Sequence, residues 1–192
     1  TYSLSTQTSA GKKIDEAASI AADTIVNGGG AVGTAGALSA TNVEPATRYA
    51  GVTENQTISF TTVNPIPSDG KIIVTFPAGF DLIGVLSTSA SSSTMDGALT
   101  ASVAGQIVTI ARSGGTQQAA AAETITLANV KNPVAGANLT SDGTTGTYKI
   151  QTATVSGVTT GLIDQDSAVA GDHIICTLAG VPAITPASFK AG

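Results

Sequence analysis

Two stretches of this chain resemble two later stretches, and this internal repetition restricts the fold more than any other feature of the sequence. Residues 1–11 match residues 147–157 at five of eleven positions, and residues 43–51 match residues 184–192 at four of nine. A composition this biased would give roughly two identities by chance over both matches, so a repeat is the better explanation. Two shorter matches continue the alignment: residues 14–15 with 163–164, and 23–26 with 172–175.

The spacing of these matches predicts how the chain is organised. The repeat period is about 140–150 residues, so the 192 residues hold one complete unit and parts of two others. We expect four segments: terminal strands of a preceding unit, or a donor segment, at 1–26; a Gly/Ala-rich joint at 27–42; a complete β-sandwich unit at 43–180; and the first strand of a following unit at 181–192.

Two interpretations of this organisation remain open. The chain is either an excerpt or one repeat of a longer tandem array, or a complete small subunit whose two ends complete neighbouring subunits. The mass of the native protein distinguishes them. A mass near 18.8 kDa favours strand donation between subunits, and a mass many times larger favours the array.

Strand signals dominate the complete unit. Residues 57–63 alternate apolar and polar side chains and are rich in β-branched residues, which is typical of a half-buried strand. Two prolines and an Asp-Gly pair at 64–70 predict a turn, and Ala104-Gly105 predicts a hairpin. Further strands are expected at residues 71–76, 84–93, 98–103, 106–110, 123–130, 147–155 and 172–178. Short strands with regular turn signals predict an all-β chain, folded as an antiparallel β-sandwich.

Helical signals are weak, and the aliphatic strand positions predict the core. Residues 117–122 are good helix formers but too few for a stable helix, so a loop or one turn is expected there. Residues 14–22 and their repeat partner 163–170 are expected to be loops or short strands. The expected core residues are Ile58, Phe60, Ile73, Val74, Phe76, Phe80, Leu99, Val103, Ile107, Ile110, Ile125, Leu127, Tyr148, Ile150, Ile174 and Ile175.

Residues 61–80, which read TTVNPIPSDGKIIVTFPAGF, resemble a known type of module. They are similar to tandemly repeated immunoglobulin-like β-sandwich modules of very long secreted or cell-surface proteins, and residues 146–152 fit the same module. The resemblance implies an immunoglobulin-like fold, an extracellular or cell-surface location, and a role in stalks, fibres, surface coats or adhesin arms. It carries over no catalytic residue. The Gly/Ala-rich stretch at 27–40 departs from the pattern, because the joint at 179–183 is shorter.

The composition argues against several other classes of protein. Charged residues make up 11 % of the chain, against roughly 25 % in an average soluble domain. The scarcity of Glu, Lys and Arg argues against a coiled coil, and a net charge of −5 without a basic cluster argues against nucleic-acid binding. No apolar run approaches about 18 residues, so no membrane span is expected in this segment.

Carboxylates near the end of the unit are the one candidate metal site. Asp164, Asp166 and Asp172 could bind Ca²⁺, because hard cations prefer carboxylate oxygens and calcium often stiffens joints between extracellular modules. The earlier repeat reads Asp15-Glu16-Ala17, so the second carboxylate is not repeated in place. A solvated acidic loop is the alternative, and no EF-hand spacing is present.

Other motifs carry little chemistry. Asn55 and Asn138 begin glycosylation sequons at the frequency that chance gives, so glycans are partners only if a glycosylating cell secretes the protein. The glycines at 28–33 lack the sequence context of a phosphate loop and predict a flexible joint. Cys176 is expected to be a small buried strand residue. His173 would point to the opposite face of that strand, which argues against a catalytic pair.

These observations predict a structural protein and no enzyme or cofactor. No Ser-His-Asp set and no Gly-x-Ser-x-Gly motif can be assembled. We expect the unit to assemble end to end with copies of itself or with adjacent repeats into an extracellular filament or surface layer, through β-strand complementation or tandem linkage. The alternative is an adhesin or carbohydrate-binding module. It would need exposed aromatic platforms, whereas the repeat equivalents Tyr2 and Tyr148 are expected to pack in cores.

Overall fold

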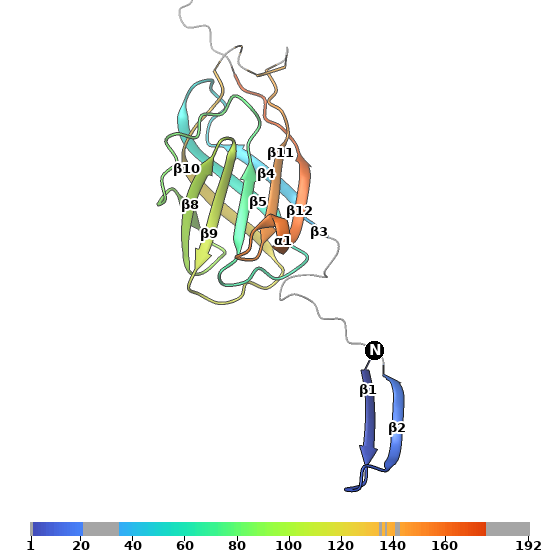
Figure 1. The fold of residues 1–192 in the computed structure, drawn as a ribbon. Coiled ribbons are helices and arrows are strands. Elements are labelled where there is room, and N and C mark those ends of the chain that lie inside the picture. The colour runs from blue at the N-terminus through green and yellow to red at the C-terminus, as the bar shows by residue number, and fades with distance from the viewer. Residues whose placement is uncertain (1, 21–34, 135, 137, 141–142, 176–192) are drawn as a thin grey trace, which may run out of the picture.

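The computed structural model describes residues 2–20, 35–134, 136, 138–140 and 143–175, and within them the fold is all-β. In this part of the chain the strands form three sheets, and the single helical element is the short α1 (Val158–Gly161). Two of the sheets belong to residues 36–175, which we call the body (Figure 1). The third sheet is a two-stranded hairpin near the N-terminus.

One sheet of the body has four antiparallel strands in the order β4-β5-β10-β7. Its central strands, β5 and β10, alternate buried side chains with partly or fully exposed ones, because successive residues of a strand point to opposite faces of the sheet. A bulge near Asn129, whose φ is 64°, shifts the register so that Leu127 and Val130 both reach the core. The strands are β4 (Ser39–Pro45), β5 (Thr53–Thr61), β7 (Ala90–Ser92) and β10 (Ala122–Lys131).

The other sheet has six strands in the order β3-β12-β11-β6-β9-β8. Every pairing in it is antiparallel except the short parallel contact between β3 and β12. A tight hairpin joins two of its strands, and Gly105 supplies the positive φ of 60° that the turn requires. The strands are β3 (Gly36–Ala37), β6 (Lys71–Thr75), β8 (Ala98–Ala104), β9 (Ile107–Ser113), β11 (Tyr148–Ala153) and β12 (Leu162–Val169).

A single apolar core unites the two sheets. It contains Ile58 and Ile125 of the four-stranded sheet together with Val74 and Ile150 of the six-stranded sheet, and all four side chains are fully buried. Phe76, Phe80 and Tyr148 form an aromatic cluster within it, with ring centroids 5.4–5.6 Å apart. Shared burial of this kind is what holds two-sheet β folds together.

Buried Arg112 ties three loops of the body together. Its guanidinium group donates to the carbonyl oxygens of Pro67 at 2.7 Å and Thr116 at 3.1 Å, and to the Asp96 carboxylate at 3.0 Å. Backbone and side-chain hydrogen bonds from Thr116 are the main reason that the pKa of Asp96 is lowered, with Arg112 adding to the effect. A buried charge with this many partners fixes the geometry of the loops around it.

The N-terminal hairpin consists of β1 (Tyr2–Gln7) and β2 (Lys13–Ile20). Within the described residues these two strands hydrogen-bond only with each other, and Figure 1 shows them outside the two sheets of the body. Residues 3–17 are all exposed. The hairpin has strand pairing but no core of its own, and an isolated two-stranded hairpin is at best marginally stable in water.

The expected strands agree with the structure except near the ends of the unit. The all-β prediction is confirmed, and the expected loop at 117–122 is a loop up to the start of β10. The expected edge strand within 84–93 is the short edge strand β7. The expected strand at 172–178 is described only to residue 175, where isolated bridges at His173 and Ile175 replace a regular strand.

Two expectations about boundaries and burial are wrong. The joint predicted at 27–42 overlaps β3 and the start of β4, so the body begins by residue 36 rather than 43. Val103, Ile107 and Ile175 were expected in the core but are 38 %, 41 % and 44 % exposed. Val103 lies near the tip of the β8–β9 hairpin, beyond the core, and Ile107 points to the outward face of the sheet. The segment 181–192, expected to begin another unit, lies outside the described residues.

Candidate assembly site

The strands β11 and β12 are neighbours in the six-stranded sheet, between β3 and β6. Strand β11 pairs along one edge with β6 over five residue pairs, from Lys149 with Thr75 to Ala153 with Lys71. On the other side it pairs with β12. Tyr148, Ile150 and Thr152 of β11 are each 0 % exposed. The pair is therefore an integral part of the body's core.

The N-terminal hairpin has the same register as the β11–β12 pair. In the hairpin, Tyr2 lies opposite Ile20 and Thr6 opposite Asp15; in the body, Tyr148 lies opposite Val169 and Thr152 opposite Asp164. The sequence alignment places these residues at equivalent positions, and the other three residue pairs and both register shifts also correspond. A hydrogen bond from the backbone to a side chain recurs as well: the Thr6 hydroxyl accepts from the Asp15 N–H at 3.2 Å, and the Thr152 hydroxyl accepts from the Asp164 N–H at 3.1 Å.

The tips of the two strand pairs differ by three residues. Both turns begin in the same way: the N–H of Gly11 donates to Thr8, the N–H of Gly157 donates to Thr154, each at 2.9 Å, and both glycines have φ of 77°. In the body the chain then forms the four-residue α1, where the hairpin has Lys12 alone. Equivalent residues of the two pairs are 146 positions apart before the tip and 149 positions apart after it. The three extra residues therefore lie at the tip, and the strand register is unchanged.

Equivalent side chains of the two pairs differ sharply in burial. Leu4 is 63 % exposed, whereas its equivalent Ile150 is 0 % exposed. Ile14 is 60 % exposed, whereas Ile163 is 2 % exposed. The hairpin thus presents to solvent the apolar side chains that the body buries at the same positions.

Asp164 connects β12 to the turn after β5. Its carboxylate accepts hydrogen bonds from the backbone N–H groups of Val63 and Asn64, both at 3.1 Å, and from the Asn64 side-chain amide at 2.7 Å. The side chain is fully buried, and a Cβ at Gly36 of β3 would collide with it. Asp15, the equivalent residue of the hairpin, is exposed, although the same residue type stands there.

Tyr148 and Asp172 form a second buried polar contact. The Tyr148 hydroxyl donates to the Asp172 carboxylate at 2.6 Å. Burial raises the pKa of Tyr148 and the pKa of Asp172 above their usual values. Both residues have equivalents in the first repeat, Tyr2 and Asp23. The residues that the two repeats share therefore include two of the buried carboxylates that accept hydrogen bonds in the body, Asp164 and Asp172.

The structure does not bring together Asp164, Asp166 and Asp172, the three residues expected to bind calcium. Among the residues that the structure describes, no three acidic, histidine or cysteine side chains are grouped to hold a metal. Each of the three carboxylates has its own protein partner, and that of Asp166 accepts a 2.7 Å hydrogen bond from the Thr41 hydroxyl. Close spacing in sequence suggested one loop. The three carboxylates instead have partners in different parts of the body.

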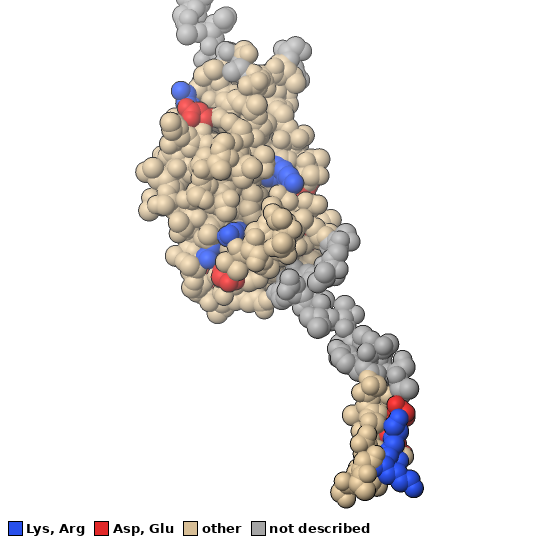
Figure 2. All heavy atoms as spheres, viewed as in Figure 1, with Lys and Arg blue, Asp and Glu red and all other residues tan. Residues whose placement is uncertain are grey.

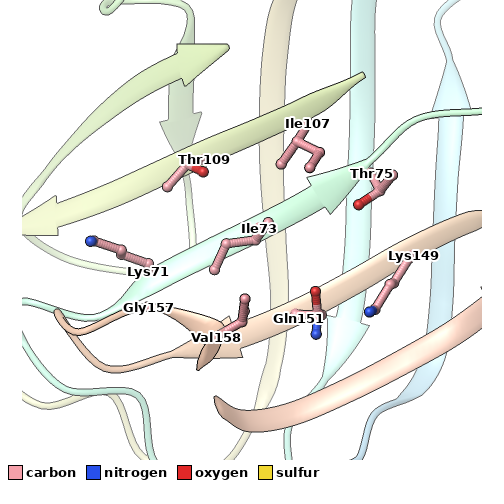
Figure 3. A pocket seen from close by; sticks show the side chains of 9 residues that line it. All are labelled: Lys71, Ile73, Thr75, Ile107, Thr109, Lys149, Gln151, Gly157 and Val158. Carbon is pink, nitrogen blue, oxygen red and sulfur yellow. The ribbon is translucent and has the colours of Figure 1, made fainter. Parts of the chain in front are cut away.

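A shallow groove crosses the outward face of the six-stranded sheet (Figure 3). Ile73 forms its floor, Lys71 and Lys149 extend at its sides, and Val158 of α1 lies against it. Its volume is about 440 Å³. The other lining residues are Thr75, Ile107, Thr109, Gln151 and Gly157.

Charge is sparse on the face of the body seen in Figure 2. The hairpin is more highly charged, and there Lys13 and Glu16 form an ion pair at 2.6 Å. No described helix has the length and apolar character needed to cross a membrane.

The remaining candidate residues are only partly described. Asn55 and Asn138 of the two sequons are both exposed. His173 is exposed, whereas Cys176 and the glycines at 28–33 lie outside the described residues. The Val63–Asn64 turn was not expected as the partner of Asp164. The repeated Ile-Asp pair at 14–15 and 163–164 was the signal that could have pointed to a specific role for that aspartate.

Comparison of the chain with protein-family models, with curated proteins and with solved structures found no match.

Proposed function

We propose that this chain is a structural repeat or subunit of an extracellular filament or surface appendage, built from immunoglobulin-like β-sandwich units that assemble end to end. One observation supports the proposal most: the described residues include two equivalent strand pairs, β1–β2 and β11–β12, but only one body. An extra strand pair with an exposed apolar face requires a second body to cover it, either in a neighbouring subunit or in an adjacent repeat.

The surface of the body fits a passive structural role. Its polar surface is mostly uncharged, and the described residues contain no cluster of acidic, histidine or cysteine side chains that could hold a metal. The perturbed pKa values of Tyr148 and Asp172 belong to a contact within the core rather than to an open cleft. Perturbed groups in such a place stabilise structure more often than they catalyse reactions.

Electron microscopy and the native mass test this function. Antibodies raised against the chain should label threads or a layer outside intact, unpermeabilised cells that make the protein. Native material should show a regular row of globules, each with the dimensions of one body. Labelling only after permeabilisation, together with chains of 18.8 kDa that stay as single molecules in solution and do not assemble, would contradict the proposal.

An adhesin or carbohydrate-binding module is the second candidate, and the groove over Ile73 favours it. The groove has two lysines, two threonines and a glutamine that could bind sugar hydroxyl groups. It lacks an aromatic platform, because Tyr148 is buried and no aromatic residue lines it. A glycan array probed with the wild-type chain and with the Gln151→Ala variant tests this candidate. Binding that the variant loses would support it, and the absence of binding would remove it.

A further inference from the structure

The N-terminal hairpin has the strand register of β11–β12, a strand pair that is packed into the body, and it has aliphatic and aspartate residues at equivalent positions. We propose that β1–β2 closes a second copy of this body, in which β1 pairs with the free β6 edge in the register of β11 and Asp15 binds the backbone N–H groups of the Val63–Asn64 turn. This inference rests on the proposed end-to-end assembly and names the surfaces that meet.

The register of the docked hairpin follows from the equivalence of the two strand pairs. In the body, Lys149 lies opposite Thr75 and Ala153 opposite Lys71. Because Ser3 and Gln7 are the equivalents of Lys149 and Ala153, Ser3 lies opposite Thr75 and Gln7 opposite Lys71 in the docked hairpin. A β6 strand without β11 has one row of unpaired backbone groups, and an added strand satisfies them.

The apolar side chains of the hairpin fit the space that the body provides. Leu4 takes the place of Ile150, and Ile14 takes the place of Ile163. These exchanges between aliphatic residues of similar volume are well tolerated in protein cores. The hairpin's charged side chains do not interfere, because its Lys13–Glu16 ion pair lies at positions equivalent to partly exposed Leu162 and Gln165.

Asp15 gives the docking its specificity. At the equivalent position the Asp164 carboxylate accepts three hydrogen bonds from Val63 and Asn64. In the hairpin nothing explains an aspartate at this place, since Asp15 is exposed and its side chain has no hydrogen-bond or ion-pair partner among the described residues. Burying a carboxylate is favourable only where N–H groups are positioned to donate hydrogen bonds to it, so Asp15 favours docking at the Val63–Asn64 turn.

The body of this chain cannot accept the hairpin while β11 and β12 are in place. The β6 edge is already paired with β11, and the Val63–Asn64 turn is already bound by Asp164. The partner is therefore a body whose own strand pair is missing or displaced. In an array this body lies in the preceding repeat, and between subunits it lies in a neighbouring copy.

Disulfide exchange between two forms of the full chain tests the proposal. The receptor form carries Cys176→Ser, Thr75→Cys, Ile150→Asp to displace β11, and Leu4→Asp to disable its own hairpin. The donor form carries Cys176→Ser and Ser3→Cys, with the new thiol activated as a coloured mixed disulfide. Attack by the receptor thiol releases the coloured thiol and joins the two chains.

Docking in the proposed register should make this exchange at least about tenfold faster than for a donor with Gln7→Cys, because docking raises the local concentration of the matched thiol. A receptor with Lys71→Cys in place of Thr75→Cys should instead react faster with the Gln7→Cys donor than with the Ser3→Cys donor, because Gln7 would lie opposite Lys71. Adding Asp15→Asn to the matched donor should reduce the rate towards that of the mismatched one.

Equal exchange rates for the two donors, or a matched rate that Asp15→Asn leaves unchanged, would overturn the proposal. Because Ile150→Asp could leave the receptor unfolded, circular dichroism is recorded with and without donor, and a receptor that excess donor does not fold also counts against the proposal. A milder receptor with Asp164→Asn in place of Ile150→Asp loses the carboxylate that anchors β12 to the Val63–Asn64 turn, so that the donor can displace the strand pair, and it must show the same order of rates. If exchange fails while electron microscopy still shows rows of globules, the units are joined in another way and the structural function stands.

Discussion

The β11–β12 pair and the N-terminal hairpin have equivalent sequences and the same strand register, but only the first is part of a core. Ile150 and Asp164 are fully buried, whereas their equivalents Leu4 and Asp15 are exposed. Strand pairing is therefore encoded locally in about twenty residues, and the core is supplied by β6, β9 and the four-stranded sheet. Equivalent strand pairs therefore contribute differently to the free energy of unfolding, depending on whether the rest of a body packs against them.

The largest difference in stability loss is expected between variants of the equivalent aliphatic residues Ile150 and Leu4. Ile150→Ala removes a fully buried side chain from the core and should lower the free energy of unfolding by about 3 kcal/mol. Leu4→Ala should change it by less than about 0.5 kcal/mol in the isolated chain, because Leu4 is exposed. Urea denaturation followed by circular dichroism measures both values. Equal losses would mean that Leu4 already packs in a core in solution.

A slightly smaller contrast is expected for the aspartates. Asp164→Ala leaves the N–H groups of Val63 and Asn64 without their acceptor, which should cost about 2 kcal/mol of stability. Asp15→Ala should leave the stability of the body unchanged. Hydrogen exchange of the two amides provides a local readout, and it should speed up in the first variant only. Unchanged protection in Asp164→Ala would show that this carboxylate does not hold the turn.

The hydrogen bond of Tyr148 should have a more modest effect. Tyr148→Phe keeps the ring in the aromatic cluster but removes the 2.6 Å hydrogen bond to Asp172, at an expected cost of about 1 kcal/mol. Tyr2→Phe is the matched control and should be neutral in the isolated chain. Thermal unfolding distinguishes the two variants. A Tyr148→Phe variant as stable as the wild type would mean that water replaces the lost hydroxyl group.

The smallest expected effect is a dependence on pH. Burial raises the pKa of Asp172 in the folded body, with Glu44 adding to the effect and both Tyr148 and Arg48 opposing it. The folded state then holds its proton more tightly than the unfolded state. Stability from this group is present at acidic pH and is lost as pH rises from about 4 through the raised pKa.

Comparison with Asp172→Asn isolates this contribution. The difference in unfolding free energy between wild type and variant should shift in favour of the wild type by less than about 1 kcal/mol as the pH is lowered from 7 to 4. Urea denaturation at several pH values measures it. A constant difference across this range would show that Asp172 does not titrate differently in the folded and unfolded states.

Local patterns predicted much of the strand structure, and the repeat alignment anticipated the equivalence of the two strand pairs. Alternation and turn residues are local signals, so β5, β6 and the β8–β9 hairpin were expected close to their observed places. The role of Asp164 could not be predicted, because its partners Val63 and Asn64 lie about a hundred residues away in sequence. The burial of Ile107 was wrong for a related reason, since an apolar strand residue near a hairpin tip can face either side of a sheet.

The short α1 turn has a consequence for the surface of any assembly closed by these strand pairs. In the body its Val158 lies over the outer face of the sheet beside Ile73, whereas the hairpin has only Lys12 at that tip. A unit closed by β1–β2 would lack this cover and would leave its Ile73 more open to solvent. Successive units of one fibre would then share a backbone scaffold while displaying different outer chemistry, so ligands or enzymes could distinguish one position along the fibre from the next.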